Sequence, residues 1–230
     1  MKLSVSLLKC MNKIVSWFCK IFLKPIVKFL FIKKVTGEKN IPKRNFILAP
    51  NHSSHLDQLV TGFVCVPRKF HYIGQIDRYQ GTDRFLLKIL YTIAGVIRVH
   101  RENNESKKEA IEKSIQVLKR GASLIIYPEG TRTRNGKIGE GKPGIAKIFL
   151  KTGVPILPVG IKGVFELMPP GTSFPKIKRE VMINIGKPLF FEEELIKAQE
   201  ISCDSTEYRE ILEKITQKVM AEIVSLVENA

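Results

Sequence analysis

The chain has 230 residues, of which 44% are hydrophobic, and this composition excludes an intrinsically disordered protein while allowing one domain with a buried core. Its net charge of +16 is uneven, with +8 on residues 1–37, +14 on residues 38–191 and −6 on residues 192–230. The basic front and body imply an anionic partner, and anionic lipid and nucleic acid both satisfy that requirement.

Residues 1–34 interleave apolar side chains with lysines. On a helical projection, five of these lysines fall within an arc of roughly 60°, opposite an apolar face. No uncharged stretch reaches the roughly 18 residues of a spanning helix, and no cleavage site of a signal peptide follows. We therefore expect a basic amphipathic helix, broken or kinked near Pro25, that lies on an anionic membrane surface. The side chains expected to bind that surface are Lys9, Lys13, Trp17, Lys20 and Lys24.

The alternative for residues 1–34 is a helix that simply packs on the domain core. Core-packing helices seldom carry eight cations and no acid, as this segment does, so the membrane-surface interpretation is preferred. The remaining residues, 35–230, are then expected to form a single domain that ends in a long helix.

Short apolar runs alternate with helix-like stretches from about residue 45 to residue 190. The predicted strands are 45–49, 70–74, 95–100, 123–127, 154–161 and 180–186. The predicted helices are 57–65, 82–93, 106–120, 142–151 and about 205–227. Such alternation is typical of an α/β fold, so we expect a largely parallel or mixed sheet flanked by helices.

Two local signals are clear within this frame. Ser106 is the expected N-cap of the helix at 106–120, with Glu109 three residues later and Gly121 after the last turn. The stretch 168–175, rich in proline, glycine, serine and threonine, is predicted to be a loop.

His52 and Asp57 follow the apolar run 46–49, where a predicted strand ends. Five residues apart on a regular helix they would point about 140° from each other, so they meet only if His52 lies in the turn and Asp57 in the first helical turn. Asp57 then accepts from Nδ1 and leaves Nε2 as a base for an alcohol. Spacing alone also allows an N-cap or first-turn acid beside an unrelated loop histidine, and on spacing alone this alternative is favoured.

A second polar segment, residues 127–134, follows the apolar run 124–126. Gly130 permits close approach of the backbone, and Arg132 offers a planar fork for a phosphate. Glu129 can hold Arg132 in place or accept from a substrate hydroxyl. An ordinary basic surface turn is the alternative, and for Arg134 and Lys137 it is the expected one.

Two further places can contribute to an anion site. Arg101, at the end of the predicted strand 95–100, is expected to complement Arg132, although an edge strand protected by charges is the alternative. Lys142, Pro143 and Gly144 open a predicted helix where a phosphate can rest on backbone amides, which is a weak signal.

Cysteine and histidine spacing does not favour a metal or disulfide framework. None of the four cysteines forms a C-x-x-C pair, which favours reduced cytosolic thiols. The histidines likewise lack HExxH-type spacing, so no metal site is expected.

These segments resemble the glycerophospholipid acyltransferases, in particular the 1-acyl-sn-glycerol-3-phosphate acyltransferases. Four blocks stand in that family's order over about residues 35–190. They are His52-x4-Asp57, Gly95 to Arg101, Tyr127-Pro-Glu-Gly-Thr-Arg-Thr133 and Val154-Pro-Ile-Leu-Pro-Val159. Any one block alone would be weak, but four in order make a specific match.

The resemblance implies direct acyl transfer from acyl-CoA or acyl-carrier protein to the sn-2 hydroxyl of lysophosphatidate, giving phosphatidate. It implies His52 as the base and Asp57 as its orienter. It implies a glycerol phosphate site formed by Arg101, Glu129, Gly130, Thr131 and Arg132. It also implies an α/β acyltransferase domain with a membrane-binding N-terminus at the cytoplasmic membrane surface, and no metal or organic cofactor beyond the acyl carrier.

Two other functions stay open at this point. Arg98 and His100 stand where the family often has an aromatic residue and an acid, so another lysolipid is an alternative acceptor. A non-enzymatic basic protein that binds membrane or nucleic acid through charge belongs to a different class. The body shows no interleaving of exposed aromatic and basic residues, so nucleic acid is not expected as a partner.

Overall fold

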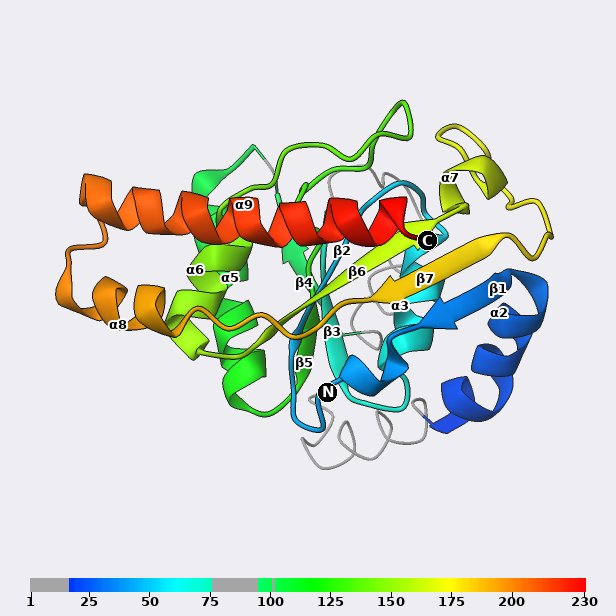
Figure 1. Ribbon diagram of the computed structural model, residues 1–230, viewed down its shortest axis with the longest axis horizontal. Coiled ribbons are helices and arrows are strands. Elements are labelled where there is room, and N and C mark those ends of the chain that lie inside the picture. Colours follow the sequence, from blue (N-terminus) through cyan, green and yellow to red (C-terminus); the bar gives the residue numbers. More distant parts are fainter. Residues whose placement is uncertain (1–16, 76–94, 101) are drawn as a thin grey trace, which may run out of the picture.

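The computed structural model describes residues 17–75, 95–100 and 102–230. They form a seven-stranded mixed sheet in the order β1-β7-β6-β2-β5-β3-β4, flanked by helices (Figure 1). The strands are β1 (Ile32–Thr36), β2 (Ile47–Pro50), β3 (Phe70–Gln75), β4 (Val96–Val99), β5 (Ser123–Ile125), β6 (Ile156–Lys162) and β7 (Val181–Ile185). Only the β6–β7 pair is antiparallel among the neighbours in this sheet. The expected largely parallel or mixed sheet is therefore confirmed.

All six strands expected from the sequence are present, and β1 is an additional one. Lys33 and Lys34 interrupt the apolar pattern of β1, and both are exposed. Because of these two lysines, the sequence predicted this stretch to be the end of a basic helix. β1 pairs in parallel with β7 at the edge of the sheet, with a register shift between Ile32 and Lys34. The expected boundary at residue 34 thus falls inside a strand.

The helices at the expected positions are α3 (Asp57–Cys65), α5 (Asn104–Lys119), α6 (Gly144–Thr152) and α9 (Thr206–Glu228). The expected helix at 82–93 lies outside the described residues. The sequence analysis missed the short elements η2 (Glu38–Asn40) and α7 (Val164–Leu167), and also α8 (Glu192–Glu200). α8 buries none of its residues fully, and only Leu195 and Ala198 pack partly against the core, so its apolar stripe is too short to reveal it.

The N-terminal cap of α5 differs from the expected one. Asn103 Oδ1 accepts from the backbone N–H groups of Glu105 and Ser106 at 2.8 and 3.0 Å. Asparagine is among the best capping residues, and it starts the helix earlier than Ser106 would. The Ser106 hydroxyl instead accepts from the His100 N–H at 2.9 Å.

The described part of the N-terminal segment is helical up to Leu30, before β1 begins. The π-helix η1 (Cys19–Leu23) continues into α2 (Lys24–Leu30), and Pro25 lies in the first turn of α2, where its missing N–H is tolerated. Of the helices in the described ranges, none is long and apolar enough to cross a bilayer.

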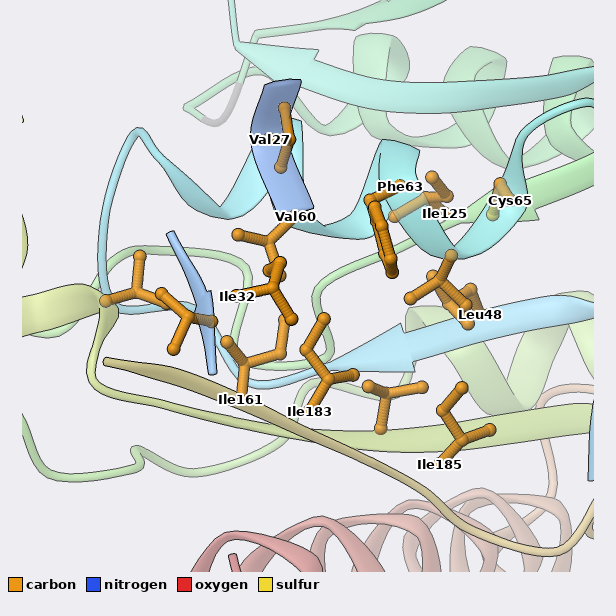
Figure 2. Packing of buried hydrophobic residues seen from close by; sticks show 14 of the residues in the cluster. Val27, Ile32, Leu48, Val60, Phe63, Cys65, Ile125, Ile161, Ile183 and Ile185 are labelled. Carbon is orange, nitrogen blue, oxygen red and sulfur yellow. The ribbon is translucent and has the colours of Figure 1, made fainter. Parts of the chain in front are cut away.

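Two apolar clusters cover the two faces of the sheet, because successive strand residues point to opposite sides. Leu48 and Ile125 belong to the cluster under α2 and α3, whereas Ile47 and Leu124 belong to the cluster under α5, α6 and α9. Figure 2 shows the first cluster, with Val60 and Phe63 of α3 above Ile161 of β6 and above Ile183 and Ile185 of β7.

The antiparallel pairing of β6 with β7 determines which strands begin and which strands end at the same edge of the sheet. Since Lys162 at the end of β6 pairs with Met182 near the start of β7, β7 and β1 begin at the edge where β2, β5 and β6 end. We call this edge the carboxyl edge. The loops after β2, β5 and β6 and the end of α2 therefore converge there.

α9 crosses β6 at close range (Figure 1). A Cβ atom placed on Gly160 would lie 2.5 Å from the backbone carbon of Leu226, well inside van der Waals contact. Glycine at this position therefore lets the helix backbone rest directly on the strand.

We predict that Gly160→Ala lowers the free energy of unfolding by about 1–3 kcal/mol, because α9 must move away from β6. Gly144→Ala is the matched control, since its Cβ would meet nothing within 4 Å and the helix favours alanine. Urea denaturation of both variants tests this, and equal stabilities would contradict the close packing.

Candidate active site

The two polar segments from the sequence lie side by side because their strands are neighbours. β2 and β5 pair in parallel, with Ile47 opposite Leu124 and Leu48 opposite Ile125, so both chains leave the sheet at the carboxyl edge. The Thr133 N–H donates to the His52 carbonyl at 2.9 Å and joins the two loops directly. Convergence of loops at the ends of parallel strands is the usual way an α/β sheet builds a site.

Asp57 is the most heavily used acceptor in this region. It is fully buried at the first position of α3. Its Oδ2 atom accepts from the backbone N–H groups of Ser53 and Ser54 at 2.7 and 2.8 Å and contacts His52 Nδ1 at 2.8 Å. Asp57 is thus both a first-turn acid and the partner of His52, which joins the two alternatives left open by the spacing.

The tautomer of His52 follows from these contacts. An ionised carboxylate only accepts hydrogen bonds, so Nδ1 carries the proton and the other ring nitrogen, Nε2, presents a lone pair. The side chain is 11% exposed, so the ring reaches the surface at the carboxyl edge. This is the arrangement of a general base with its orienting acid.

A second contact of the imidazole is with the face of its ring, and it comes from Tyr127, whose role was not predicted from the sequence. The ring of Tyr127 stacks on His52 with centroids 3.8 Å apart and an angle of 17° between the planes. The Tyr127 hydroxyl lies 3.3 Å from Thr61 Oγ1, which donates to the Asp57 carbonyl at 2.8 Å. Burial raises the pKa of Tyr127 well above its usual value, with the Asp57 carboxylate as a further cause, so this hydroxyl stays protonated.

Asn51 is a second residue with an unforeseen role. Its amide donates to the Ile161 carbonyl at 2.9 Å, and its side-chain oxygen accepts from the Ile161 N–H at 2.8 Å. The side chain thereby continues the β2–β6 pairing beyond the end of β2. Its only signal in the sequence was its position directly before His52.

Glu129 makes two backbone contacts that the sequence did not predict. It is 3% exposed, and its two oxygens accept from the backbone N–H groups of His52 at 2.7 Å and Gly139 at 2.8 Å. Burial raises the pKa of Glu129, and these two amide hydrogen bonds act in the opposite direction. The carboxylate therefore ties the loop that carries His52 to the segment around residue 139.

Gly130 forms the tight turn that follows. Its φ of +67° is readily adopted only by glycine, and a Cβ atom there would lie 3.0 Å from the Lys142 side chain. The Gly130 N–H donates to the Tyr127 carbonyl at 2.9 Å, and the Lys142 N–H donates to the Pro128 carbonyl at 2.8 Å. The turn therefore brings Lys142 against the segment that carries Thr131 and Arg132.

A pocket of about 350 Å³ opens beside this turn. It is lined by Glu129, Thr131, Arg132, Thr133, Asn135, Lys137, Ile138, Gly139, Glu140 and Lys142. Three expected site residues thus share one pocket, and Lys137, expected to be an ordinary surface residue, lines it as well. Arg101 lies outside the described residues, so its place at this site stays a prediction.

The described part of the N-terminal segment packs on the domain with one side and exposes large apolar residues on another. Val27 is buried in the core, whereas Trp17, Phe22 and Phe29 are exposed. Lys20 Nζ lies 4.7 Å from the Trp17 ring centre, and Lys24 Nζ lies 4.6 Å from that of Phe63 in α3.

Lys24 therefore packs against the domain instead of extending along an exposed lysine row, and burial lowers its pKa. Lys9 and Lys13 lie outside the described residues, so their membrane role stays a prediction.

Comparison with known proteins finds similarity between this chain and acyltransferases. The family described as Acyltransferase matches residues 33–162. A 1-acyl-sn-glycerol-3-phosphate acyltransferase of Borreliella burgdorferi is 38% identical over 130 residues, which cover 54% of this chain and 49% of that protein. A chloroplastic 1-acyl-sn-glycerol-3-phosphate acyltransferase of Brassica napus is 27% identical over 161 residues, covering 68% and 44%.

A solved structure matches over nearly the whole chain. The 1-acyl-sn-glycerophosphate acyltransferase PlsC from Thermotoga maritima aligns with a TM-score of 0.61 and 26% identity, covering 96% of this chain and 83% of that one. By contrast, this chain spans less than half of the length of the two sequence relatives.

We predict that Glu129→Gln lowers the free energy of unfolding by about 1–3 kcal/mol, because a glutamine NH2 group would face one of the two backbone N–H donors. Glu140→Gln is the matched control, since Glu140 lines the same pocket but is exposed. Urea denaturation should separate the two variants, and equal stabilities would show that Glu129 does not hold the loops together.

Proposed function

This chain belongs to the acyltransferase family, and from that premise we propose that it moves an acyl group from a thioester donor to the sn-2 hydroxyl of lysophosphatidate, forming phosphatidate. The observation that carries the proposal is the buried contact of His52 Nδ1 with Asp57 at 2.8 Å. The names of the relatives and of the similar solved structure support this choice of acceptor.

The reaction needs one base and no electron transfer. Nε2 of His52 takes the proton of the acceptor hydroxyl as its oxygen attacks the thioester carbonyl. The tetrahedral intermediate then collapses, the C–S bond breaks, and the imidazolium returns the proton to the departing thiolate. Asp57 stabilises the imidazolium while it exists and keeps the ring in the reactive orientation.

Transfer is direct, with no acyl-enzyme intermediate, because the nucleophiles described near His52 have other roles. The Ser54 hydroxyl donates to the Met168 carbonyl at 2.8 Å, and the Ser53 hydroxyl faces Asp57 Oδ1 at 3.5 Å. Burial raises the pKa of Cys65 to about 12, which leaves this thiol protonated near neutral pH. The acceptor alcohol is therefore the attacking group.

The pocket beside Gly130 suits the phosphate of the acceptor. Arg132, Lys137 and Lys142 line it, and Thr131 adds a hydroxyl donor. Glu129 supports this site from below through its amide contacts. Arg101 joins the same anion site in this proposal, in line with the family resemblance.

The N-terminal segment supplies the membrane attachment. Its exposed large apolar residues form a row along η1 and α2 that suits the interfacial zone of an anionic bilayer. These residues are Trp17, Phe18, Ile21, Phe22, Leu23, Ile26 and Phe29. Lys9, Lys13 and Lys20 face lipid phosphates in this arrangement, and the enzyme works as a peripheral protein at the cytoplasmic face.

The acyl donor is acyl-CoA or an acyl-carrier protein, since the basic body of the chain suits the phosphates of the first and the acidic surface of the second. The steps above use side chains alone, in line with the family resemblance, which implies no metal.

We predict that His52→Ala lowers kcat for acyl transfer by about 10²- to 10⁴-fold, because the base is lost. Asp57→Asn should lower kcat to a similar extent, since an asparagine NH2 group facing Nδ1 forces the proton onto Nε2. Transfer to lysophosphatidate in mixed micelles measures both variants.

His55→Ala serves as the control in the same loop, because His55 is exposed. Full activity in His52→Ala would eliminate the proposed base. If the wild type acylated another lysolipid but not lysophosphatidate, the proposed mechanism would stand and the proposed acceptor would be wrong.

We predict that Arg132→Ala raises KM for lysophosphatidate by about 10- to 100-fold with a smaller change in kcat, because a charge-assisted hydrogen bond to phosphate is lost. Arg134→Ala is the matched control, since Arg134 does not line the pocket. Steady-state kinetics at varied lysophosphatidate concentration measures KM for both variants. An equal rise in KM in the two variants would show that the phosphate does not bind in this pocket.

A further inference from the structure

The loop over residues 168–180, between α7 and β7, carries apolar side chains that nothing in the described chain covers. Phe174 is 85% exposed and Ile177 is 71% exposed, so Phe174 is the most exposed large apolar residue in the described ranges. The same loop carries Lys176, Lys178 and Arg179 against one acid, Glu180. Exposed apolar tips flanked by cations are typical of a surface that meets anionic lipid.

The first end of this loop is attached to the active site. The Met168 carbonyl accepts from the Ser54 hydroxyl at 2.8 Å, and Ser54 also donates its N–H to Asp57. Phe165 belongs to α7, just before the loop. Its ring would lie 3.3 Å from a Cβ atom placed on Gly136, so it packs against the segment that lines the pocket. The loop therefore rises directly beside the catalytic residues at the carboxyl edge.

The second end of the loop meets the N-terminal segment. Arg179 Nε donates to the Ile32 carbonyl at 3.3 Å, and the Val181 N–H donates to the Phe31 carbonyl at 2.9 Å. α2 ends at this point, and its Phe29 is 73% exposed. In Figure 1 the yellow loop and the blue α2 both lie at the right-hand end of the molecule.

The loop is held in shape by its own backbone. Pro169 O accepts from the Thr172 N–H and hydroxyl at 3.2 and 2.8 Å, and Leu167 O accepts from the Lys176 N–H at 2.8 Å. Phe174 therefore projects from a closed turn without a buried partner. A preformed apolar tip loses little conformational entropy on binding, which favours a docking role.

We infer that loop 168–180 is a second membrane-contact element, in which Phe174 and Ile177 enter the interfacial zone of an anionic bilayer. Lys176 and Arg179 then lie at the level of the lipid phosphates, while Lys178 pairs with Glu180. Contact through both the loop and α2 turns the carboxyl edge toward the bilayer. The inference rests on the proposed function in one respect, that the acceptor reaching His52 is a lipid.

The test uses the full chain with vesicles of phosphatidylglycerol and phosphatidylcholine. Phe174→Ser combined with Ile177→Ser should weaken vesicle partitioning by about tenfold, because two apolar side chains no longer enter the bilayer. Phe190→Ser combined with Ile196→Ser is the matched control. These two residues are 59% and 61% exposed and precede or belong to α8, so the control should partition like the wild type.

A second measurement reports on the loop itself. Phe174→Trp in a Trp17→Phe background places the only tryptophan at the loop tip, and its emission should shift to the blue when vesicles are added. Unchanged partitioning together with an unshifted emission would overturn the inference. If the Phe174→Ser, Ile177→Ser variant changed oligomeric state without lipid while its vesicle partitioning stayed unchanged, the loop would contact a second copy of the chain. That outcome would also overturn the inference.

Turnover separates this inference from the proposed function. With a short-chain, water-soluble lysophosphatidate, the loop variant should keep wild-type kcat, while its turnover of long-chain acceptor in vesicles should fall with its partitioning. If the wild type acylates neither acceptor, the proposed function fails, and the vesicle results still decide the role of the loop.

Discussion

The structure of the catalytic end depends on one buried carboxylate oxygen, Asp57 Oδ2. A buried charge is costly unless several donors surround it, and here two backbone N–H groups and an imidazole do so. Its place in the first turn of α3 adds the favourable field of the helix N-terminus. Because the same oxygen serves the loop backbone and His52, the fold of the loop and the orientation of the base cannot vary independently.

A second buried carboxylate extends this arrangement to the neighbouring loop. Glu129 binds the N–H of His52 on one side and that of Gly139 on the other, so the base and the pocket are built on a common support. Parallel pairing of β2 with β5 brings the two carboxylates to the same edge, and the antiparallel β7 brings loop 168–180 and the end of α2 there too. In the proposed mechanism, the mixed sheet thus brings the base, the anion pocket and the membrane-facing surface to one edge.

Much of the fold could be predicted from the sequence, because strand and helix periodicities are local properties of the chain. The helix predicted at about 205–227 is present as α9, and the turn required for His52 to meet Asp57 is the one observed. β1 was missed because its pairing with β7 depends on tertiary contact, whereas Lys33 and Lys34 locally resemble an amphipathic helix. The amide partners of Glu129, the stacking of Tyr127 and the place of Lys137 depend on how distant loops meet, and no spacing along the chain encodes that directly.

Direct transfer to the lysophosphatidate hydroxyl by a His52–Asp57 base can be tested by mass spectrometry of the intact protein, mixed with an acyl-CoA or acyl-carrier-protein donor before and after lysophosphatidate is added. Direct transfer predicts unmodified protein and no thiol release without acceptor, followed by phosphatidate formation and matching thiol release once acceptor is present. Acylated protein that accumulates with thiol release before acceptor is added would rule out direct transfer, and a failure to form phosphatidate with either donor would rule out the proposed reaction.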